Sequence, residues 1–299
     1  MLSKLRGKAP PNATTRRELR VRKKEQVKQR EIHRGKLPPL PAFDKKIVEA
    51  VETVGAFVTS LQELQDNNIN EPFDLPASRA TIEQPGRQLP APKDYHGIAS
   101  NNQLRALSQE ILWGFNERFL AIAENYIGLP VAYRGLVMRR DYADGQHVET
   151  RKWHLDAEDV RIMKIIVYLN DVDEDGGPFR LLPKALTPTK GIELVNDRLP
   201  DEVLDRLVPK DSYVKATGPA GTVLIADPAT IWHHGCVPIS GDRLTSFFAY
   251  NSQIPLRPQH CQPMFSRDYL AGAKLSPRQE AAITYQYPVT YPDGGKLAA

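Results

Sequence analysis

Hydrophobic residues recur at helical spacing in the first part of the chain and at strand spacing in the second. A broad apolar stripe predicts a helix over 101–126, which Gly128 ends. The stretch 43–64 is also amphipathic, but Gly55 interrupts it. We therefore expect either one helix there, or a helix followed by a short strand over 56–60.

After residue 130 the pattern changes to short apolar runs separated by turn signals such as Asp175-Gly176-Gly177. Helices first and then a run of strands argue against a parallel α/β sheet, and favour an antiparallel sandwich or barrel packed against helices. The segment 65–98 is rich in Asn, Pro and Gly and is predicted to be loop. The predicted strands are 131–142, 160–170, 179–182, 213–216, 221–225 and 243–252, with a short helix over 201–207.

The composition changes at Pro38-Pro39, and the roughly 260 residues that follow this short arm fit one large domain or two small ones. With 41% hydrophobic and 25% charged residues, the chain has the composition of an ordinary globular protein. We predict a basic N-terminal arm over 1–38, flexible or loosely docked, and a single domain over 39–299. The parts of that domain are expected to be a helical segment (40–128), a strand core (130–252) and a C-terminal extension (253–299).

The net charge of +4 conceals an uneven distribution. Residues 1–36 hold thirteen Lys and Arg against three Glu, which gives +10 and leaves −6 for the rest. A mildly acidic body is not built to bind nucleic acid over its whole surface, so only the arm could make such a contact. Residues 15–34 could form a charged helix with few apolar anchors.

Other composition features exclude several classes of protein. No apolar run approaches the roughly 18 residues that cross a bilayer, so no membrane span is expected. The two cysteines, Cys236 and Cys261, are too few for a disulfide framework, which favours a reducing, cytoplasmic location. The N-terminus lacks the apolar segment of a secretory signal. Oligomeric state leaves no signal in the sequence.

The candidate chemistry lies at His154-x-Asp156, because residues two apart on an extended segment face the same side. A histidine downstream, at His233 or His234, would complete two imidazoles and one carboxylate. Such a facial triad leaves three positions of an octahedral Fe(II) open. Arg243 opens a predicted strand and could bind a carboxylate bidentately, with the Thr245 hydroxyl on the same side.

This pattern resembles the Fe(II)/2-oxoglutarate-dependent dioxygenases, and within them the phytanoyl-CoA hydroxylase-like branch. The resemblance covers about residues 130–252 and includes the run from Lys164 to Pro183, although Lys184-Ala185-Leu186 replaces the family's usual Gly-Ser-His. It implies a double-stranded β-helix (jelly roll, cupin-like) with iron bound by His154, Asp156 and His233. His233 is preferred because it is followed by x-Gly and stands ten residues before Arg243, as in the family.

The resemblance further implies the cosubstrates 2-oxoglutarate and O2, with Arg243 and Thr245 holding the distal carboxylate of 2-oxoglutarate. The expected reaction releases succinate and CO2 and hydroxylates an unactivated C–H of a small molecule or carrier-bound acid. Asp156 disfavours a halogenase, because related halogenases carry a small residue there.

Several alternatives stay open at this point. The fold could be a non-catalytic jelly-roll binding module, or the basic arm could recruit a nucleic-acid hydroxylase or demethylase. His147-x-Glu149 is a competing but weaker pair. Residues that could line the cosubstrate pocket, or equally form its wall or the surface, are Lys164, Tyr168 and Arg180, and with less support Tyr133, Arg134, Met138 and Arg139.

Overall fold

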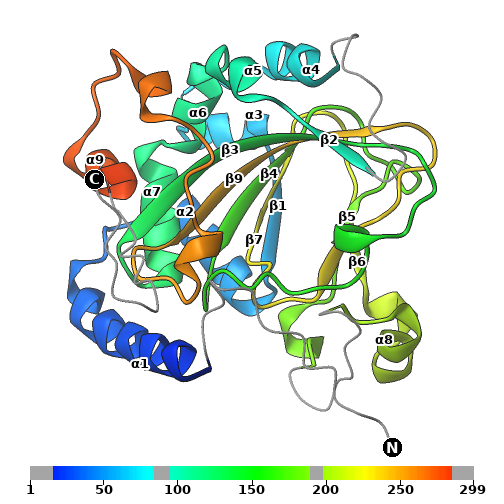
Figure 1. The fold of residues 1–299 in the computed structure, drawn as a ribbon, viewed down its shortest axis with the longest axis horizontal. Coiled ribbons are helices and arrows are strands. Elements are labelled where there is room, and N and C mark those ends of the chain that lie inside the picture. The colour runs from blue at the N-terminus through cyan, green and yellow to red at the C-terminus, as the bar shows by residue number, and fades with distance from the viewer. Residues whose placement is uncertain (1–15, 70, 84–94, 189–197, 285–299) are drawn as a thin grey trace, which may run out of the picture.

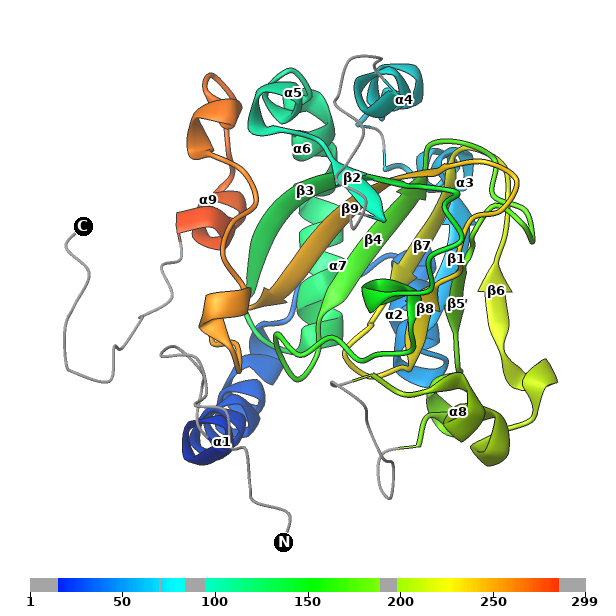
Figure 2. The same ribbon diagram turned by 45° about the vertical axis from the view of Figure 1, so that its right-hand side comes forward.

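The computed structural model describes residues 16–69, 71–83, 95–188 and 198–284. In these residues a larger and a smaller antiparallel sheet lie opposite each other, and helices cover the outer side of the larger one (Figures 1 and 2). The strand order is β1-β7-β4-β9-β3-β2 in the larger sheet and β6-β5-β8 in the smaller. The strands are β1 Ala56–Ser60, β2 His96–Ile98, β3 Val131–Asp141, β4 Met163–Tyr168, β5 Phe179–Leu181, β6 Val214–Ala216, β7 Thr222–Ala226, β8 His233–Gly235 and β9 Arg243–Ser252.

Most of the helices lie on one side of the larger sheet, whereas α8 lies near the smaller sheet (Figure 2). None of those described is both long and apolar enough to cross a bilayer. The predicted fold class, mainly β with flanking helices around a jelly-roll core, is confirmed. The helices are α1 Arg16–His33, α2 Ala42–Thr53, α3 Leu61–Asp66, α4 Leu75–Glu83, α5 Asn101–Arg105, α6 Ser108–Gly114, α7 Glu117–Ile127, α8 Asp201–Leu207 and α9 Pro277–Thr284.

The central strand β4 divides its side chains between two cores, because successive residues of a strand face opposite sides. Ile165 and Val167 are fully buried in the core that the larger sheet shares with the helices. Ile166 and Tyr168 point the other way and pack with Phe179 of the smaller sheet. The candidate chemistry lies in this second layer, between the sheets.

The segment 101–126 is helical, but it forms three separate helices, α5, α6 and α7. The prediction of one continuous helix was therefore wrong. The chain turns at Asn116, whose side chain accepts a hydrogen bond from the Arg118 amide at 2.7 Å and caps α7. Gly114, just before the turn, lies so close to the Phe248 ring that a Cβ would stand 2.1 Å from it. The apolar stripe could not reveal these breaks, because its residues stay buried on both sides of each turn.

The stretch after α2 resolves the ambiguity at Gly55, which adopts a left-handed φ of 98°. The short strand β1 follows the helix, which confirms the expectation of a helix followed by a strand over 56–60. The segment 65–98 is not wholly loop, because α4 and β2 lie within it. β2 pairs with the end of β3 and thereby extends the larger sheet at its edge.

The helix α1 corresponds to the charged helix expected over 15–34 and is docked on the body. Its middle residue Gln26 is fully buried, although the helix has few apolar anchors. Arg30 donates to the Ile127 carbonyl at 3.0 Å, and His33 lies 2.7 Å from Glu124. Polar side chains therefore hold this part of the arm in place.

Candidate metal centre

Two distant segments meet where the candidate ligands lie. The backbone N–H groups of His154 and His233 each donate to the carbonyl of the other, at 3.0 and 3.2 Å. The Asp156 amide donates to the Pro228 carbonyl at 2.9 Å. These bonds bring the His-x-Asp segment against β8, so the chain spacing of 79 residues between the histidines becomes a direct contact.

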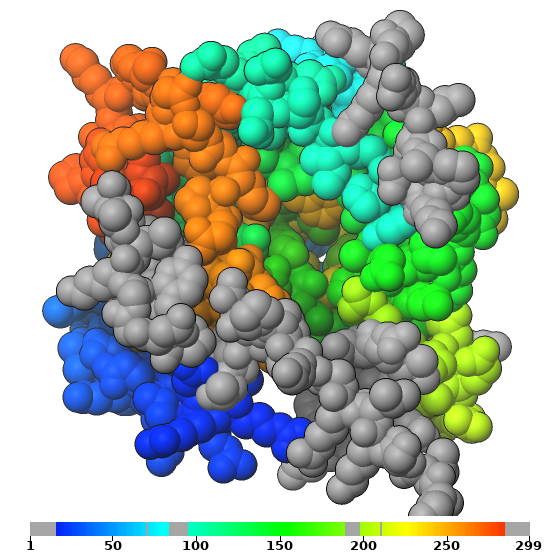
Figure 3. All heavy atoms as spheres, in the orientation of Figure 1, coloured from blue at the N-terminus to red at the C-terminus, as the bar shows by residue number. Residues whose placement is uncertain are grey.

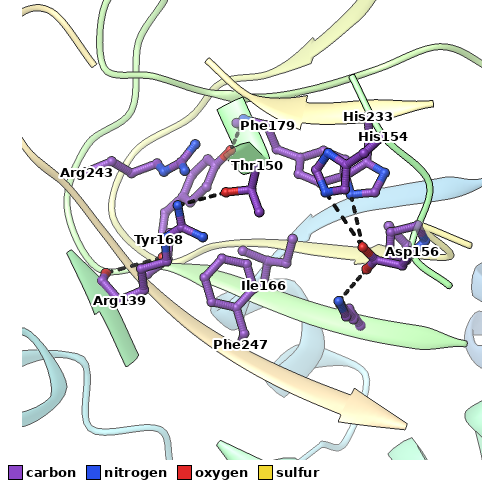
Figure 4. A pocket seen from close by; sticks show the side chains of 15 residues that line it. Arg139, Thr150, His154, Asp156, Ile166, Tyr168, Phe179, His233, Arg243 and Phe247 are labelled. Carbon is purple, nitrogen blue, oxygen red and sulfur yellow. Dashed lines mark hydrogen bonds and ion pairs between the residues drawn. The ribbon is translucent and has the colours of Figure 1, made fainter. Parts of the chain in front are cut away.

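The side chains of His154, Asp156 and His233 converge at one end of a cavity (Figure 4). Oδ1 of Asp156 lies 3.6 Å from Nε2 of His154 and 4.0 Å from Nε2 of His233. One ligand atom from each residue lies within 4.8 Å of the others. Ligands about 2.1 Å from one ion stand roughly 3–4 Å apart, so a small inward adjustment would let these atoms hold a metal.

Both histidines present Nε2 to the cavity because their other ring nitrogen is occupied. Nδ1 of His154 lies 2.8 Å from the Lys152 carbonyl, and Nδ1 of His233 lies 3.1 Å from the Ile231 carbonyl. Burial lowers the pKa of His154, and burial with the neighbouring His154 lowers the pKa of His233 well below its usual range. Neutral imidazoles with a free Nε2 lone pair are suited to bind a metal.

The neighbouring His234 faces away from this group, as alternation along a strand requires. Its ring packs edge-on against Trp153, with centroids 4.3 Å apart, and its Nδ1 lies 3.1 Å from the Arg151 carbonyl. The competing pair His147 and Glu149 is engaged elsewhere, with Asp201 at 4.0 Å and Arg198 at 3.5 Å respectively. The structure therefore brings His233, and not these alternatives, beside His154 and Asp156.

Arg243, on β9, lies toward the other end of the cavity (Figure 4). Thr245, two residues further along the same strand, also lines the cavity. Nη2 of Arg243 donates to Asp141 at 2.8 Å, and Nη1 donates to the Gly177 carbonyl. Its Nε is buried without a hydrogen-bond partner among the described residues. The guanidinium passes over Gly235, where a Cβ would stand 2.6 Å from Nη2. A buried arginine with an unused donor, in space that a glycine leaves open, fits an anionic ligand.

Asp141 ties Arg243 to Arg139, whose Nε donates to the same carboxylate at 2.9 Å. Burial alone would raise the pKa of Asp141, but the two guanidinium groups hold it below its usual range. One carboxylate balances only one of two arginines, so this end of the cavity keeps a net positive charge. Nothing in the sequence pattern pointed to Asp141, because its role depends on pairing between β3 and β9.

The cavity between these ends has a volume of about 120 Å³. One water needs about 10–15 Å³ of such space, so there is room for on the order of ten small groups, the size of a five-carbon dicarboxylate. Of the other candidates, Lys164, Tyr168 and Arg139 line the cavity, while Arg180 lies over the Tyr213 ring at 4.2 Å. Tyr133 and Met138 belong to the helix-side core, and Arg134 pairs with Glu158. Thr150 and Phe247 also line the cavity and were not anticipated.

No family model matches the sequence, and no curated protein matches it. Among solved structures, EctD from S. alaskensis in its apoform has a TM-score of 0.51 at 19% identity, covering 80% of this chain and 86% of that one. HygX from Streptomyces hygroscopicus, with nickel and 2-oxoglutarate bound, has a TM-score of 0.46 at 15% identity, covering 72% and 88%. The epimerase SnoN, with Fe3+, alpha ketoglutarate and nogalamycin RO, has a TM-score of 0.45 at 13% identity, covering 80% and 94%. These structures do not single out the phytanoyl-CoA hydroxylase-like branch; the chain shares the jelly-roll fold of EctD.

Proposed function

We propose that this protein is an Fe(II)- and 2-oxoglutarate-dependent oxygenase that hydroxylates a small molecule or a carrier-bound acid. The observation that carries the proposal is one cavity with two neutral histidines and a carboxylate at one end, and a buried arginine at the other. Two His and one carboxylate with open positions are typical of non-haem Fe(II) oxygenases. The fold supports it as well, since EctD has been crystallised with bound Fe and with 2-oxoglutarate.

Each residue has a separate task in this scheme. His154, Asp156 and His233 would hold Fe(II), and their backbone bonds keep the three side chains together at one end of the cavity. When bound, the iron supplies the oxidative chemistry with O2, which converts 2-oxoglutarate to succinate and CO2 and hydroxylates the substrate. Arg243 and Thr245 would bind the distal carboxylate of 2-oxoglutarate. Ile166, Phe179 and Phe247 also line the cavity, and their apolar surfaces would keep water away from the site.

The test is succinate formation from 2-oxoglutarate by the purified protein with Fe(II) and O2. Wild type should form succinate slowly without substrate and faster with the right one, so a metabolite library screened by oxygen consumption would identify the substrate class. His233→Ala should abolish turnover, and His234→Ala is the matched control that keeps the ligand set. If the wild-type protein neither binds metal nor forms succinate, the alternative of a non-catalytic jelly-roll binding module would be favoured instead.

A second candidate, oxygenation of a nucleic acid, draws support from α1. That helix buries Gln26 against the body and exposes basic residues along its length. Binding to duplex DNA or RNA should then weaken with salt, by about 0.9 in log–log slope for each phosphate contact. The double variant Arg20→Glu and Lys24→Glu should reduce that slope. If nucleic-acid binding depends neither on salt nor on these two residues, oxygenation of a nucleic acid is eliminated as a candidate function. The exposed basic residues of α1 are Arg16, Arg17, Arg20, Lys23, Lys24 and Lys28.

A further inference from the structure

The two oxygens of the Asp156 carboxylate face different partners. Oδ1 points to the histidines, 3.6 Å from His154 and 4.0 Å from His233. Oδ2 accepts a hydrogen bond from the ammonium group of Lys164. The carboxylate is therefore divided, with one oxygen offered to a metal and the other already engaged.

The sheet has room for Lys164 at this place. The residue lies on β4, where Ala226 of β7 and Ala249 of β9 stand directly opposite it on the two neighbouring strands. Directly opposite residues share a face of a sheet, so two methyl groups flank the lysine stem. The side chain keeps 22% of its surface exposed and lines the cavity. A lysine in the middle of a central strand is thus accommodated by small neighbours and directed at Asp156.

The charges around Lys164 are balanced before any metal arrives. Its Nζ also lies 3.7 Å from Glu158, which in turn pairs with Arg134 at 3.3 Å. Asp156, Lys164, Glu158 and Arg134 together carry no net charge. A cation beside a metal ligand repels the metal, so Lys164 does not serve to raise metal affinity.

We propose that Lys164 is a positioning residue that holds Oδ2 of Asp156, so that this carboxylate binds the metal through Oδ1 alone. A carboxylate that binds through both oxygens would occupy a fourth position. Binding through one oxygen keeps three coordination positions open. 2-Oxoglutarate would occupy two of these positions and O2 the third. This inference rests on the proposed function and concerns how the same site keeps its open positions.

The test uses Mn(II) as the probe in the full-length protein, without turnover. Mn(II) affinity is measured from the EPR signal of the free ion, and accessible positions from the water-proton relaxation that bound Mn(II) causes. Wild type should show about three exchangeable waters. Lys164→Met should show about two exchangeable waters and should bind Mn(II) several-fold more tightly. It should bind 2-oxoglutarate about tenfold more weakly than wild type.

A merely structural role for Lys164 predicts a different result, namely that the affinities for Mn(II) and 2-oxoglutarate fall together. That result, or unchanged water number and 2-oxoglutarate affinity in Lys164→Met, would overturn the inference. Lys164→Arg should restore the wild-type values, since a guanidinium can bond Oδ2 as well. Lys215→Met, at a surface pair with Glu174, is the matched control and should behave as wild type. Wild-type protein that binds neither Mn(II) nor 2-oxoglutarate would instead refute the proposed function.

Discussion

The side-chain amide of Gln26, on α1, donates a hydrogen bond to the carboxylate of Asp159, 133 residues further along the chain. Asp159 lies three residues after Asp156, and its carboxylate also accepts bonds from the amides of Val160 at 2.8 Å and Ser252 at 3.0 Å. The basic helix is thus joined to the segment that carries two candidate metal ligands. Its anchor is a buried polar network, not an apolar seam.

Gln26→Ala should therefore destabilise the protein. The change leaves the buried Asp159 carboxylate, whose pKa burial already raises, with one partner fewer. Removing one partner of a buried group costs about 1–3 kcal/mol, measured as the free energy of unfolding in urea. Gln29→Ala is the matched control, because Gln29 bonds the exposed Glu25 and its loss should cost under about 0.5 kcal/mol. Equal effects of the two changes would contradict the anchoring role of Gln26.

His234 should make the protein sensitive to acid. Burial, with the nearby Arg180, lowers its pKa to about 3, whereas a histidine in the unfolded chain has a pKa of about 6.5. Between these values the unfolded state binds the extra proton, so stability is lost as pH falls below about 6.5, by roughly 1.4 kcal/mol per pH unit.

The variant His234→Asn isolates this contribution, because it removes the titration and keeps a side-chain donor for the Arg151 carbonyl. Unfolding free energies of wild type and variant, measured in urea at pH 7.5, 5.5 and 4.5, give the difference at each pH. The advantage of wild type should shrink as pH falls. Other buried groups, such as Asp227 with its pKa raised to about 6, cancel in that difference. A difference independent of pH would mean that His234 is protonated as easily in the folded state.

The sequence predicted those features that local pattern determines. The strand over Arg243–Ser252 has the bounds expected, and so does the helix Asp201–Leu207, because apolar period and turn residues bound both. Spacing also marked His154 and Asp156, and the resemblance to the dioxygenases favoured His233 over His234; the fold brings these three residues together. Their assignment as metal ligands stays a prediction, as do the roles of Arg243 and Thr245 and the division into an arm over 1–38 and one domain.

Other features depend on contacts that no local pattern records. β8 is three residues long and exists because β5 pairs with it, so periodicity could not show it. Lys164 was a candidate to line the cosubstrate pocket, but no local pattern showed that its ammonium group would bond Asp156. Gln26 stands in a strongly charged helix, where nothing distinguishes it from its exposed neighbours.

Asp141→Asn should destabilise the protein strongly. The change leaves Arg243 and Arg139 facing each other without a compensating charge, and breaking a buried ion pair from one side costs about 3–5 kcal/mol. Urea unfolding measures the loss. Asp268→Asn, which breaks an exposed pair with Arg105, is the control and should leave the unfolding curve unchanged. A small effect of Asp141→Asn would show that solvent already screens the two arginines.

Gly235→Ala should weaken the binding of 2-oxoglutarate while leaving metal binding intact. An added Cβ would stand 2.6 Å from Nη2 of Arg243, and this nitrogen is held by Asp141 at 2.8 Å. The guanidinium must therefore move and give up part of that pair, which misplaces the group that we expect to bind the distal carboxylate. A displaced ligand-binding arginine costs on the order of tenfold in affinity, or about 1.4 kcal/mol.

Titration of the Mn(II)-loaded protein with 2-oxoglutarate measures this effect. Gly241→Ala is the matched control. Apart from its two chain neighbours, no atom of the described residues lies within 4 Å of the position of its added Cβ, and its backbone is not left-handed. Arg243→Met combined with Gly235→Ala should be no worse than Arg243→Met alone, since both changes act on one guanidinium. Additive losses in the double variant would mean that Gly235 affects the ligand by another route, and equal affinities of Gly235→Ala and wild type would remove Arg243 from the binding site.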